Sequence, residues 1–127
     1  MATLLYAGIL GLLAVLLANN VLYVRLRGDR EPAWRADATL RVQANFVENV
    51  PLALVLLGLL EYSGIGATAT HILGSALVIA RLLHAWGLGA YEGANYPRLI
   101  GAQGTFLLVS IMAVAAIYQF MRGTISG

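Results

Sequence analysis

The sequence has no cysteine and no lysine, and only 11% of its 127 residues are charged. Without cysteine, the chain can form no disulfide, no thiolate metal site and no cysteine nucleophile, so any thiol chemistry requires a thiol from outside the chain. Every basic residue is an arginine, and the net charge is only +2. Such a weak positive charge argues against a general nucleic-acid-binding surface, so we expect no nucleic acid partner.

Common catalytic signatures are also missing. The sequence contains no Walker loop, no glycine fingerprint for dinucleotides and no HExxH zinc motif. The two histidines, His71 and His84, fall in one predicted helix but too far apart along it to bind one metal ion together. We therefore predict that the protein has no metal site.

Hydrophobic residues are abundant instead, at 60% of the chain, whereas soluble domains contain roughly 45–50%. A helix needs about 20 residues to cross a hydrocarbon core about 30 Å thick. Segments of that length cover approximately residues 3–24, 40–60, 67–88 and 99–121. The first follows no basic region and exceeds the roughly 7–15 residues of a signal-peptide core, so we expect it to be retained. We predict an all-α fold: an integral membrane four-helix bundle that forms a single domain over residues 1–127.

The connections between these segments indicate how the chain is oriented. Residues 25–39 carry several arginines and are predicted to form a water-facing loop or short interfacial segment, whereas residues 61–66 form a tight turn without arginine. Residues 89–97 contain glycine and proline and lead into Arg98. By the positive-inside rule, the first and third connections face the cytoplasm and both termini lie outside, although Arg122 favours the opposite orientation.

Two of the predicted helices carry polar side chains toward one end. Arg41, Asn45 and Glu48 are spaced i, i+4 and i+7, which places the last two within about 40° of Arg41 around a helix. Arg81 and His84 share a face near the end of the next helix. Ionisable groups inside a span are costly, so they usually face the bundle interior or a wet cavity. We expect the two polar stripes to lie at the same depth.

Two further arginines belong to the same end of the bundle. Arg25 ends the first predicted helix, and Arg98 begins the fourth. Several arginines combined with Glu48, an asparagine and a histidine suit a small ligand that carries several carboxylates and an amine. Arginine forks bind carboxylates through two parallel hydrogen bonds, and Glu48 can accept hydrogen bonds from an ammonium group. We therefore predict a ligand site at the cytoplasmic end.

Other interpretations of these residues stay open from the sequence. Arg25 and Arg41 also fit the role of anchors whose side chains reach the lipid headgroups. Glu48 and Arg81 also fit a buried ion pair between helices that binds no ligand. His84 also fits a hydrogen-bonded core histidine. None of these alternatives changes the predicted four-helix fold.

A small transporter or proton-relay protein is a further interpretation, because intramembrane glutamate, arginine and histidine also mark ion paths. The distribution of charge opposes it. The polar residues cluster at one end, and at the other end His71 and Glu61 stand nearly alone. We therefore favour a ligand site over an ion path.

The pattern RxQxNxxExxP from Arg41 to Pro51, at the start of the second predicted helix, resembles the MAPEG family, membrane-associated proteins in eicosanoid and glutathione metabolism. The resemblance extends over the whole chain. Residues 23–27 are similar to the end of the family's first helix and residues 80–84 to its third. Arg98 falls where a fourth-helix arginine is expected.

The resemblance implies a homotrimer that binds glutathione between neighbouring subunits and opens toward the cytoplasm and the bilayer. The implied glutathione-binding residues are Arg25, Arg41, Asn45, Glu48, Arg81 and His84. Arg98 is the implied catalytic residue, because a guanidinium near the glutathione sulfur favours the nucleophilic thiolate over the thiol. The expected function is a membrane glutathione transferase or peroxidase that acts on a lipophilic electrophile or a lipid hydroperoxide. The alternative is a noncatalytic lipid-binding or scaffold protein.

The sequence also departs from the family pattern. Ala44 stands where prostaglandin E synthase relatives have an arginine, and Leu88 stands where eicosanoid-synthesising members usually have a tyrosine. We therefore expect fewer contacts to glutathione, with Tyr91 or Tyr96 as a candidate for the missing hydroxyl. These differences favour the less specialised bacterial branch, and we expect the protein to lie in a bacterial inner membrane.

Overall fold

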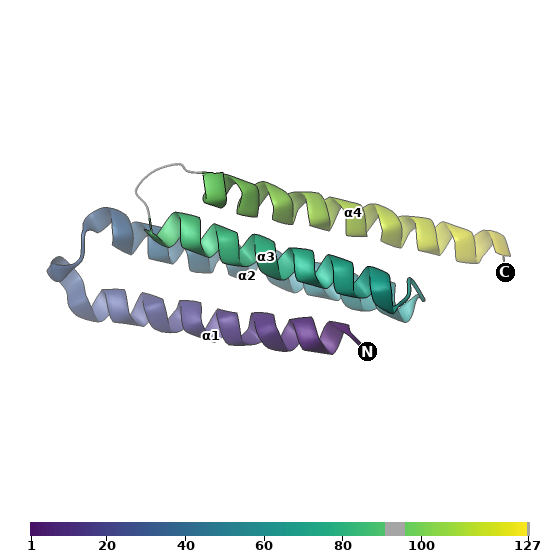
Figure 1. Ribbon diagram of the computed structural model, residues 1–127, viewed down its shortest axis with the longest axis horizontal. Coiled ribbons are helices and arrows are strands. Elements are labelled where there is room, and N and C mark those ends of the chain that lie inside the picture. Colours follow the sequence, from purple (N-terminus) through teal and green to yellow (C-terminus); the bar gives the residue numbers. More distant parts are fainter. Residues whose placement is uncertain (91–95, 127) are drawn as a thin grey trace.

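The computed structural model describes residues 1–90 and 96–126, and the side chains of residues 1–87 and 99–123. Four long helices form the bundle, and each runs antiparallel to the next: α1 (Thr3–Arg27), α2 (Ala33–Tyr62), α3 (Ala67–Ala90) and α4 (Tyr96–Ser126), with a short 3₁₀ helix, η1 (Gly28–Arg30), after α1. Figure 1 shows the N- and C-termini at the same end of the bundle. Each long helix contains a stretch long and apolar enough to span a membrane. The predicted all-α, four-helix membrane fold is confirmed.

The second helix begins earlier than the sequence predicted. α2 starts at Ala33 rather than near residue 40, and α1 continues to Arg27, so most of the predicted loop over residues 25–39 is helical. Pro32 stands at the N-cap of α2, where its missing N–H removes no helical hydrogen bond. With 30 residues, α2 is about 45 Å long and extends beyond a hydrocarbon core of about 30 Å. Membrane thickness therefore does not determine where this helix begins.

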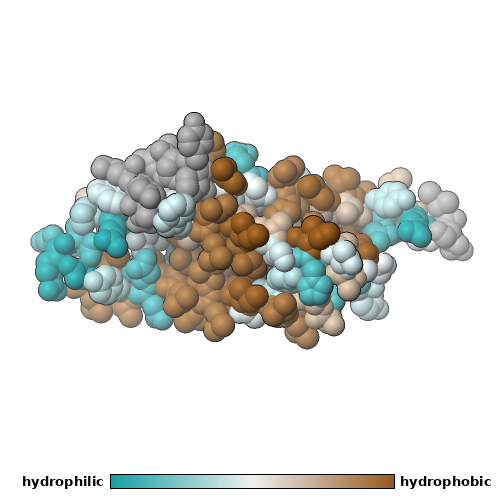
Figure 2. Space-filling view, viewed as in Figure 1, coloured by the Kyte–Doolittle hydropathy of each residue, from teal (hydrophilic) through white to brown (hydrophobic). Residues whose placement is uncertain are grey.

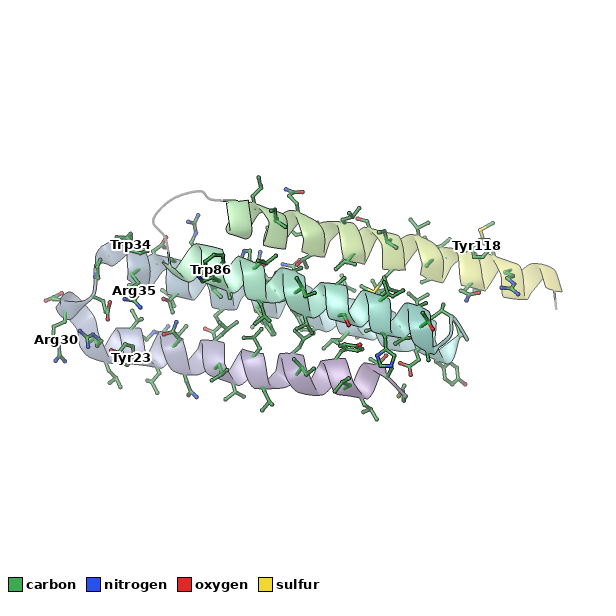
Figure 3. The ribbon with its side chains drawn as sticks, viewed as in Figure 1. Tyr23, Arg30, Trp34, Arg35, Trp86 and Tyr118 are labelled. Atoms are coloured by element: carbon green, nitrogen blue, oxygen red, sulfur yellow. The ribbon has the colours of Figure 1, made fainter. Side chains whose placement is uncertain are left out.

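Salt bridges and a glycine form the tight connection between α1 and α2. Glu31 Oε1 lies 2.7 Å from Arg27 Nε, and Glu31 Oε2 lies 3.7 Å from Arg35 Nη1. Gly28, at φ 54°, ends α1 in a conformation that other residues rarely adopt. Figure 3 marks this polar end of the bundle with Tyr23, Arg30, Trp34 and Arg35. The many charged side chains of this segment led us to predict a loop, although Trp34, Ala38 and Val42 follow a helical spacing and pack together.

The core of the bundle contains apolar side chains from every long helix. Leu10, Leu57, Leu77 and Met112, one from each helix, are almost fully buried. Much of the outer surface is apolar as well, and Figure 2 shows a broad hydrophobic region across the middle of the molecule with polar residues toward the ends. Such a large exposed apolar surface is suited to lipid acyl chains rather than to water.

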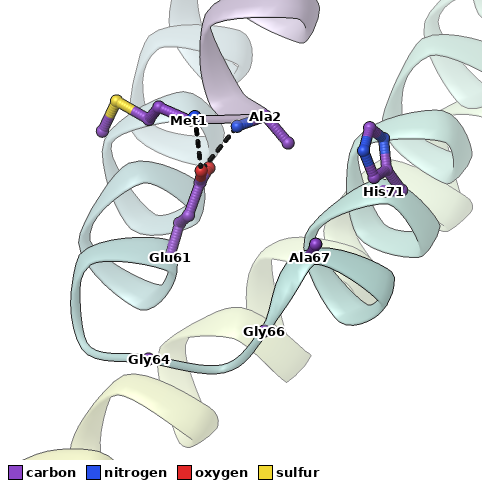
Figure 4. Close-up of a pocket in the computed structure, with 7 residues that line it drawn as sticks. All are labelled: Met1, Ala2, Glu61, Gly64, Gly66, Ala67 and His71. Carbon is purple, nitrogen blue, oxygen red and sulfur yellow. Dashed lines mark hydrogen bonds and ion pairs between the residues drawn. The ribbon is translucent and has the colours of Figure 1, made fainter.

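At the end that holds both termini, polar residues connect α1 to its neighbours. Glu61, near the end of α2, accepts hydrogen bonds from the backbone N–H groups of Ala2 (2.5 Å) and Thr3 (2.7 Å) and thereby caps α1 (Figure 4). His71 Nδ1 on α3 lies 2.6 Å from the Tyr6 hydroxyl oxygen on α1. The sequence suggested that Glu61 and His71 stand nearly alone at this end. In the structure, each of them instead joins its helix to α1.

α3 and α4 approach each other closely at Gly101. A Cβ atom placed on Gly101 would lie 2.5 Å from the backbone nitrogen of His84 and 2.6 Å from the carbonyl oxygen of Ala80. Because these are backbone atoms, they cannot rotate away as the end of a side chain can. Thr105, one turn further along α4, is also fully buried. The absence of a side chain at Gly101 thus determines how closely the two helices pack.

Replacing Gly101 by alanine is expected to destabilise the protein by about 1–3 kcal/mol because the added methyl group forces the helices apart, although alanine has the higher helix propensity. Gly104→Ala is the matched control, since its Cβ would lie 3.6 Å from the Ala80 Cβ, an ordinary van der Waals contact. Thermal unfolding of both variants in one detergent measures the difference. Equal midpoints would contradict the close approach at Gly101.

Candidate functional site

The helix ends that carry the predicted site residues meet at one end of the bundle. The C-terminal ends of α1 and α3 and the N-terminal ends of α2 and α4 lie opposite the chain termini (Figure 1). Arg81 Nη1 on α3 donates a hydrogen bond of 2.7 Å to Asn45 Oδ1 on α2. This contact confirms that the polar stripes of the two helices lie at the same depth.

Arg81 lies at the centre of this contact, with only 1% of its surface exposed. Its guanidinium carbon lies 5.7 Å from the centroid of the Phe46 ring, and its Nη1 lies 3.4 Å from the Thr105 hydroxyl oxygen on α4. The Nε atom has no hydrogen-bond partner among the described residues. Side chains from α2 and α4 therefore hold the guanidinium in place, while its Nε is left without a partner among the described residues.

The contacts described for Arg81 are all to uncharged groups. Removing an arginine from water costs several kcal/mol unless an anion and hydrogen bonds compensate. Glu48 is exposed, and no carboxylate among the described residues forms a salt bridge with Arg81. The interpretation of Glu48 and Arg81 as a buried ion pair is therefore wrong. An anion that reaches Arg81 would form a charge-assisted hydrogen bond with a guanidinium already held in position.

The remaining predicted ligand-binding residues do not all gather around Arg81 within one chain. Arg41 Nη1 instead lies 3.7 Å from Asp37 Oδ2, in an exposed pair one helical turn apart. Arg25 lines a pocket of about 200 Å³ between the end of α1 and the start of α2. The buried or half-buried members of the predicted set are Asn45, Arg81 and His84, and the exposed members are Arg25, Arg41 and Glu48.

Two residues that contact Arg81 were not predicted to belong to the site. Threonine is a small residue type common where membrane helices pack, so Thr105 gave no sign of a role at the site. Its hydroxyl donates a hydrogen bond of 2.8 Å to the Gly101 carbonyl oxygen, which leaves the hydroxyl oxygen available to accept from Arg81. Phe46 follows Asn45 in the sequence, but an aromatic residue on a largely apolar helix gives no sign of a guanidinium contact.

The predicted catalytic residue lies at the same end of the bundle. The backbone of Arg98 is in the first turn of α4, while its side chain lies outside the described residues. Tyr91 and the side chains of Leu88 and Tyr96 also lie outside them. The catalytic role of Arg98 and the role of either tyrosine therefore stay predictions.

A separate pocket of about 490 Å³ lies at the opposite end of the bundle (Figure 4). The residues that line it are Met1, Ala2, Glu61, Gly64, Gly66, Ala67 and His71. Its carboxylate, Glu61, already accepts hydrogen bonds from the α1 backbone, and its histidine is hydrogen-bonded to Tyr6. These contacts explain the pocket's polar residues as helix-joining groups, so we do not assign the predicted ligand to it.

Comparison with known proteins agrees with this architecture. The sequence matches the MAPEG family over residues 3–118. It is 32% identical over 124 residues to the inner membrane protein YecN of Escherichia coli K12, an alignment that covers 93% of this chain and 92% of that relative. YecN of Escherichia coli O6:H1 matches with the same identity and coverage. No solved structure matches the chain. A match over nearly the whole chain, on a bundle of four membrane-spanning helices, shows that this protein belongs to the MAPEG family.

Proposed function

We propose that this protein is a membrane glutathione transferase or peroxidase that activates the glutathione thiol against a lipophilic electrophile or a lipid hydroperoxide. The observation that carries the proposal is the buried guanidinium of Arg81, whose described contacts are all to uncharged groups. Membership of a family that acts in glutathione metabolism supports glutathione as the anion that Arg81 binds.

The charges of glutathione match those of the predicted residues. The tripeptide carries two carboxylates and one ammonium group at neutral pH. We assign one carboxylate to Arg81, beside Asn45, and the other to Arg25 and Arg41, because arginine binds carboxylates through two parallel hydrogen bonds. Glu48 accepts the ammonium group. His84, buried one turn from Arg81 on α3, completes the binding set.

The division of these residues between the interior and the surface supports a site shared between copies of the chain. Arg25, Arg41 and Glu48 are exposed on one chain, and charged groups near a membrane are costly unless they reach water, a headgroup or a partner. In the proposed homotrimer, a neighbouring copy covers these side chains. Glutathione then lies between two subunits, in a site open to the cytoplasm and to the bilayer.

Arg98 is proposed to stabilise the glutathione thiolate. A thiol with a reference pKa of about 8.5 is mostly protonated at neutral pH, and a nearby guanidinium favours ionisation. In conjugation, the sulfur attacks an electrophilic carbon and forms a C–S bond as the leaving group departs with its electron pair. In peroxide reduction, the sulfur attacks the terminal oxygen and the O–O bond breaks. The alkoxide takes up the proton lost from the thiol, which leaves an alcohol and a glutathione sulfenic acid. A second glutathione then converts the sulfenic acid to the disulfide and water.

Calorimetric titration of detergent-purified protein with glutathione tests the proposal. We expect the wild type to bind and Arg41→Ala to bind about tenfold more weakly or worse, because a hydrogen bond to a charged group contributes about 1.5–3 kcal/mol. Arg30→Ala is the matched control, since Arg30 is an exposed arginine at the same end but outside the predicted site.

The titration has two outcomes that contradict parts of this proposal. A wild-type protein that binds no glutathione would reject it and favour the alternative, a noncatalytic lipid-binding or scaffold membrane protein. An equal loss of affinity in Arg30→Ala and Arg41→Ala would indicate a general effect of charge. That result would remove Arg41 from the site.

A further inference from the structure

Thr70 and Thr105 are two buried threonines that make the same contact with their own helices. Both are fully buried, and each hydroxyl donates a hydrogen bond of 2.8 Å to the carbonyl oxygen of the glycine four residues earlier. A helical threonine can form this bond without any other partner. Of the two, Thr105 also contacts an arginine, because its oxygen lies 3.4 Å from Arg81 Nη1. The contact with Arg81 therefore distinguishes Thr105 from Thr70.

The chemistry of the two groups fixes the direction of this contact. A threonine hydroxyl has one hydrogen, and Thr105 donates it to the Gly101 carbonyl oxygen, so its oxygen can only accept a further hydrogen bond. A guanidinium contains donors and no acceptor. Arg81 on α3 therefore donates to Thr105 on α4.

The Nη1 group of Arg81 has a neutral acceptor on each of two helices. Nη1 carries two hydrogens, and it lies 2.7 Å from Asn45 Oδ1 on α2 and 3.4 Å from the Thr105 oxygen on α4. Nε has no partner among the described residues. The edge of the guanidinium formed by Nε and Nη2 is thus the one that these two contacts do not use. Such an edge can bind a carboxylate through two parallel hydrogen bonds.

We propose that Thr105 is a positioning residue for Arg81: together with Asn45 it holds Nη1 and thereby presents the Nε–Nη2 edge to a carboxylate of the ligand. This inference rests on the proposed function, in which Arg81 binds one carboxylate of glutathione. A single acceptor at Nη1 would allow the guanidinium plane to turn about that one hydrogen bond, whereas acceptors from α2 and α4 fix the plane. Thr105 acts through Arg81 and does not itself touch the ligand.

Calorimetric titration with glutathione measures the contribution of the Thr105 hydroxyl. Thr105→Val keeps the shape of the side chain without the hydroxyl and is expected to bind glutathione about tenfold more weakly, as for one lost hydrogen bond to a charged group. Thr105→Ala, which places no extra methyl group beside the charge, should give the same loss. Thr105→Ser restores the hydroxyl and should recover the wild-type affinity.

Thr70→Val is the matched control, because it removes the same bond to the preceding turn at an equally buried position that contacts no arginine among the described residues. This variant should bind glutathione as the wild type does. Thermal unfolding in the same detergent compares the cost of the two valine substitutions for the fold. An equal loss of affinity in Thr70→Val and Thr105→Val would reduce the role of Thr105 to helix packing.

Two monoamides of glutathione relate the loss of affinity to one carboxylate. In each of them, one of the two carboxylates is replaced by a neutral carboxamide. The monoamide that lacks the carboxylate held by Arg81 should bind to Thr105→Val and to the wild type with nearly equal affinity. The other monoamide should keep the full tenfold difference. A general disturbance of the structure would instead weaken all three ligands alike, and that result would overturn the proposal.

Nitrogen-15 NMR of arginine-labelled protein without ligand reports on the Arg81 guanidinium directly, and the loss of signals in Arg81→Met identifies them. Two acceptors at Nη1 slow the rotation of this group, so Thr105→Val should speed it up, whereas Thr105→Ser should not. Unchanged Arg81 signals in Thr105→Val would overturn the positioning role. The expected change in a protein that binds no glutathione would support that role and reject glutathione as the ligand, and with it the proposed function.

Discussion

Replacing Arg98 by alanine is expected to lower the kcat of glutathione conjugation by about 100-fold or more, with little change in glutathione affinity. A preorganised cationic group at a reacting anion contributes about 10²–10³-fold to the rate. Without it the thiol ionises only at higher pH, so the residual rate of the variant should rise with pH up to about 8.5 and beyond. The wild-type rate should level off at lower pH, because its thiol is already ionised there. Stopped-flow measurement of thiolate absorbance and the pH profile of kcat report both effects.

Two comparisons separate a catalytic role of Arg98 from a structural one. Arg98→Lys keeps a positive charge and should recover part of the rate, although a lysine cannot reproduce the planar guanidinium. Arg30→Ala removes an arginine outside the proposed site and should keep the wild-type kcat. Unchanged turnover in Arg98→Ala would contradict the catalytic assignment. A collapsed fold would make Arg98 a structural residue, and lost glutathione binding in a folded protein would make it a binding residue.

Replacing Arg81 by methionine is expected to weaken glutathione binding by about 100-fold or more, since a buried ion-pairing contact is worth about 3–5 kcal/mol when one partner is removed. The same substitution should leave the thermal unfolding midpoint unchanged or raise it. The described partners of Arg81 are neutral and do not offset the free-energy cost of removing its charge from water. An apolar side chain of similar length carries no such cost. Lost affinity with retained stability is typical of a residue kept for binding.

Leu77→Ala provides the contrasting control for Arg81→Met. Leu77 is fully buried one turn earlier on α3, and truncating it should cost about 2–5 kcal/mol of stability through the cavity that remains. Calorimetry and thermal unfolding in one detergent compare the two variants. A large fall in the midpoint of Arg81→Met, similar to that of Leu77→Ala, would show that Arg81 mainly holds the helices together.

The sequence predicted the number of spans and the positions of α1 and α3 well, because uncharged apolar runs of bilayer length have few other stable structures. It placed the start of α2 near residue 40, whereas the helix begins at Ala33. Pro32 at the N-cap is compatible with this start of α2, and the Glu31–Arg35 ion pair, at 3.7 Å, links the first turn to the residue before it. The many charged residues of these turns concealed the helical spacing of Trp34, Ala38 and Val42, which pack together in the structure.

For the candidate site, the sequence identified the correct end of the bundle but not the contacts. It treated Arg41, Asn45 and Glu48 as equal members of one stripe. In the structure only Asn45 turns inward to Arg81, while Arg41 and Glu48 stay exposed. The partners Phe46 and Thr105 gave no chemical signal in the sequence, because neither residue type is usually a ligand for a cation.

The sequence by itself therefore determined that four helices cross the membrane and that the candidate site residues gather at one end, since both properties depend only on residue type and order along the chain. Only the tertiary structure decided which polar group meets Arg81. Asn45 and Glu48 are about 60° apart around α2, so a modest rotation of this helix would exchange them. That rotation depends on packing against α3 and α4, whose close contact at Gly101 places Arg81 beside Asn45 and Thr105.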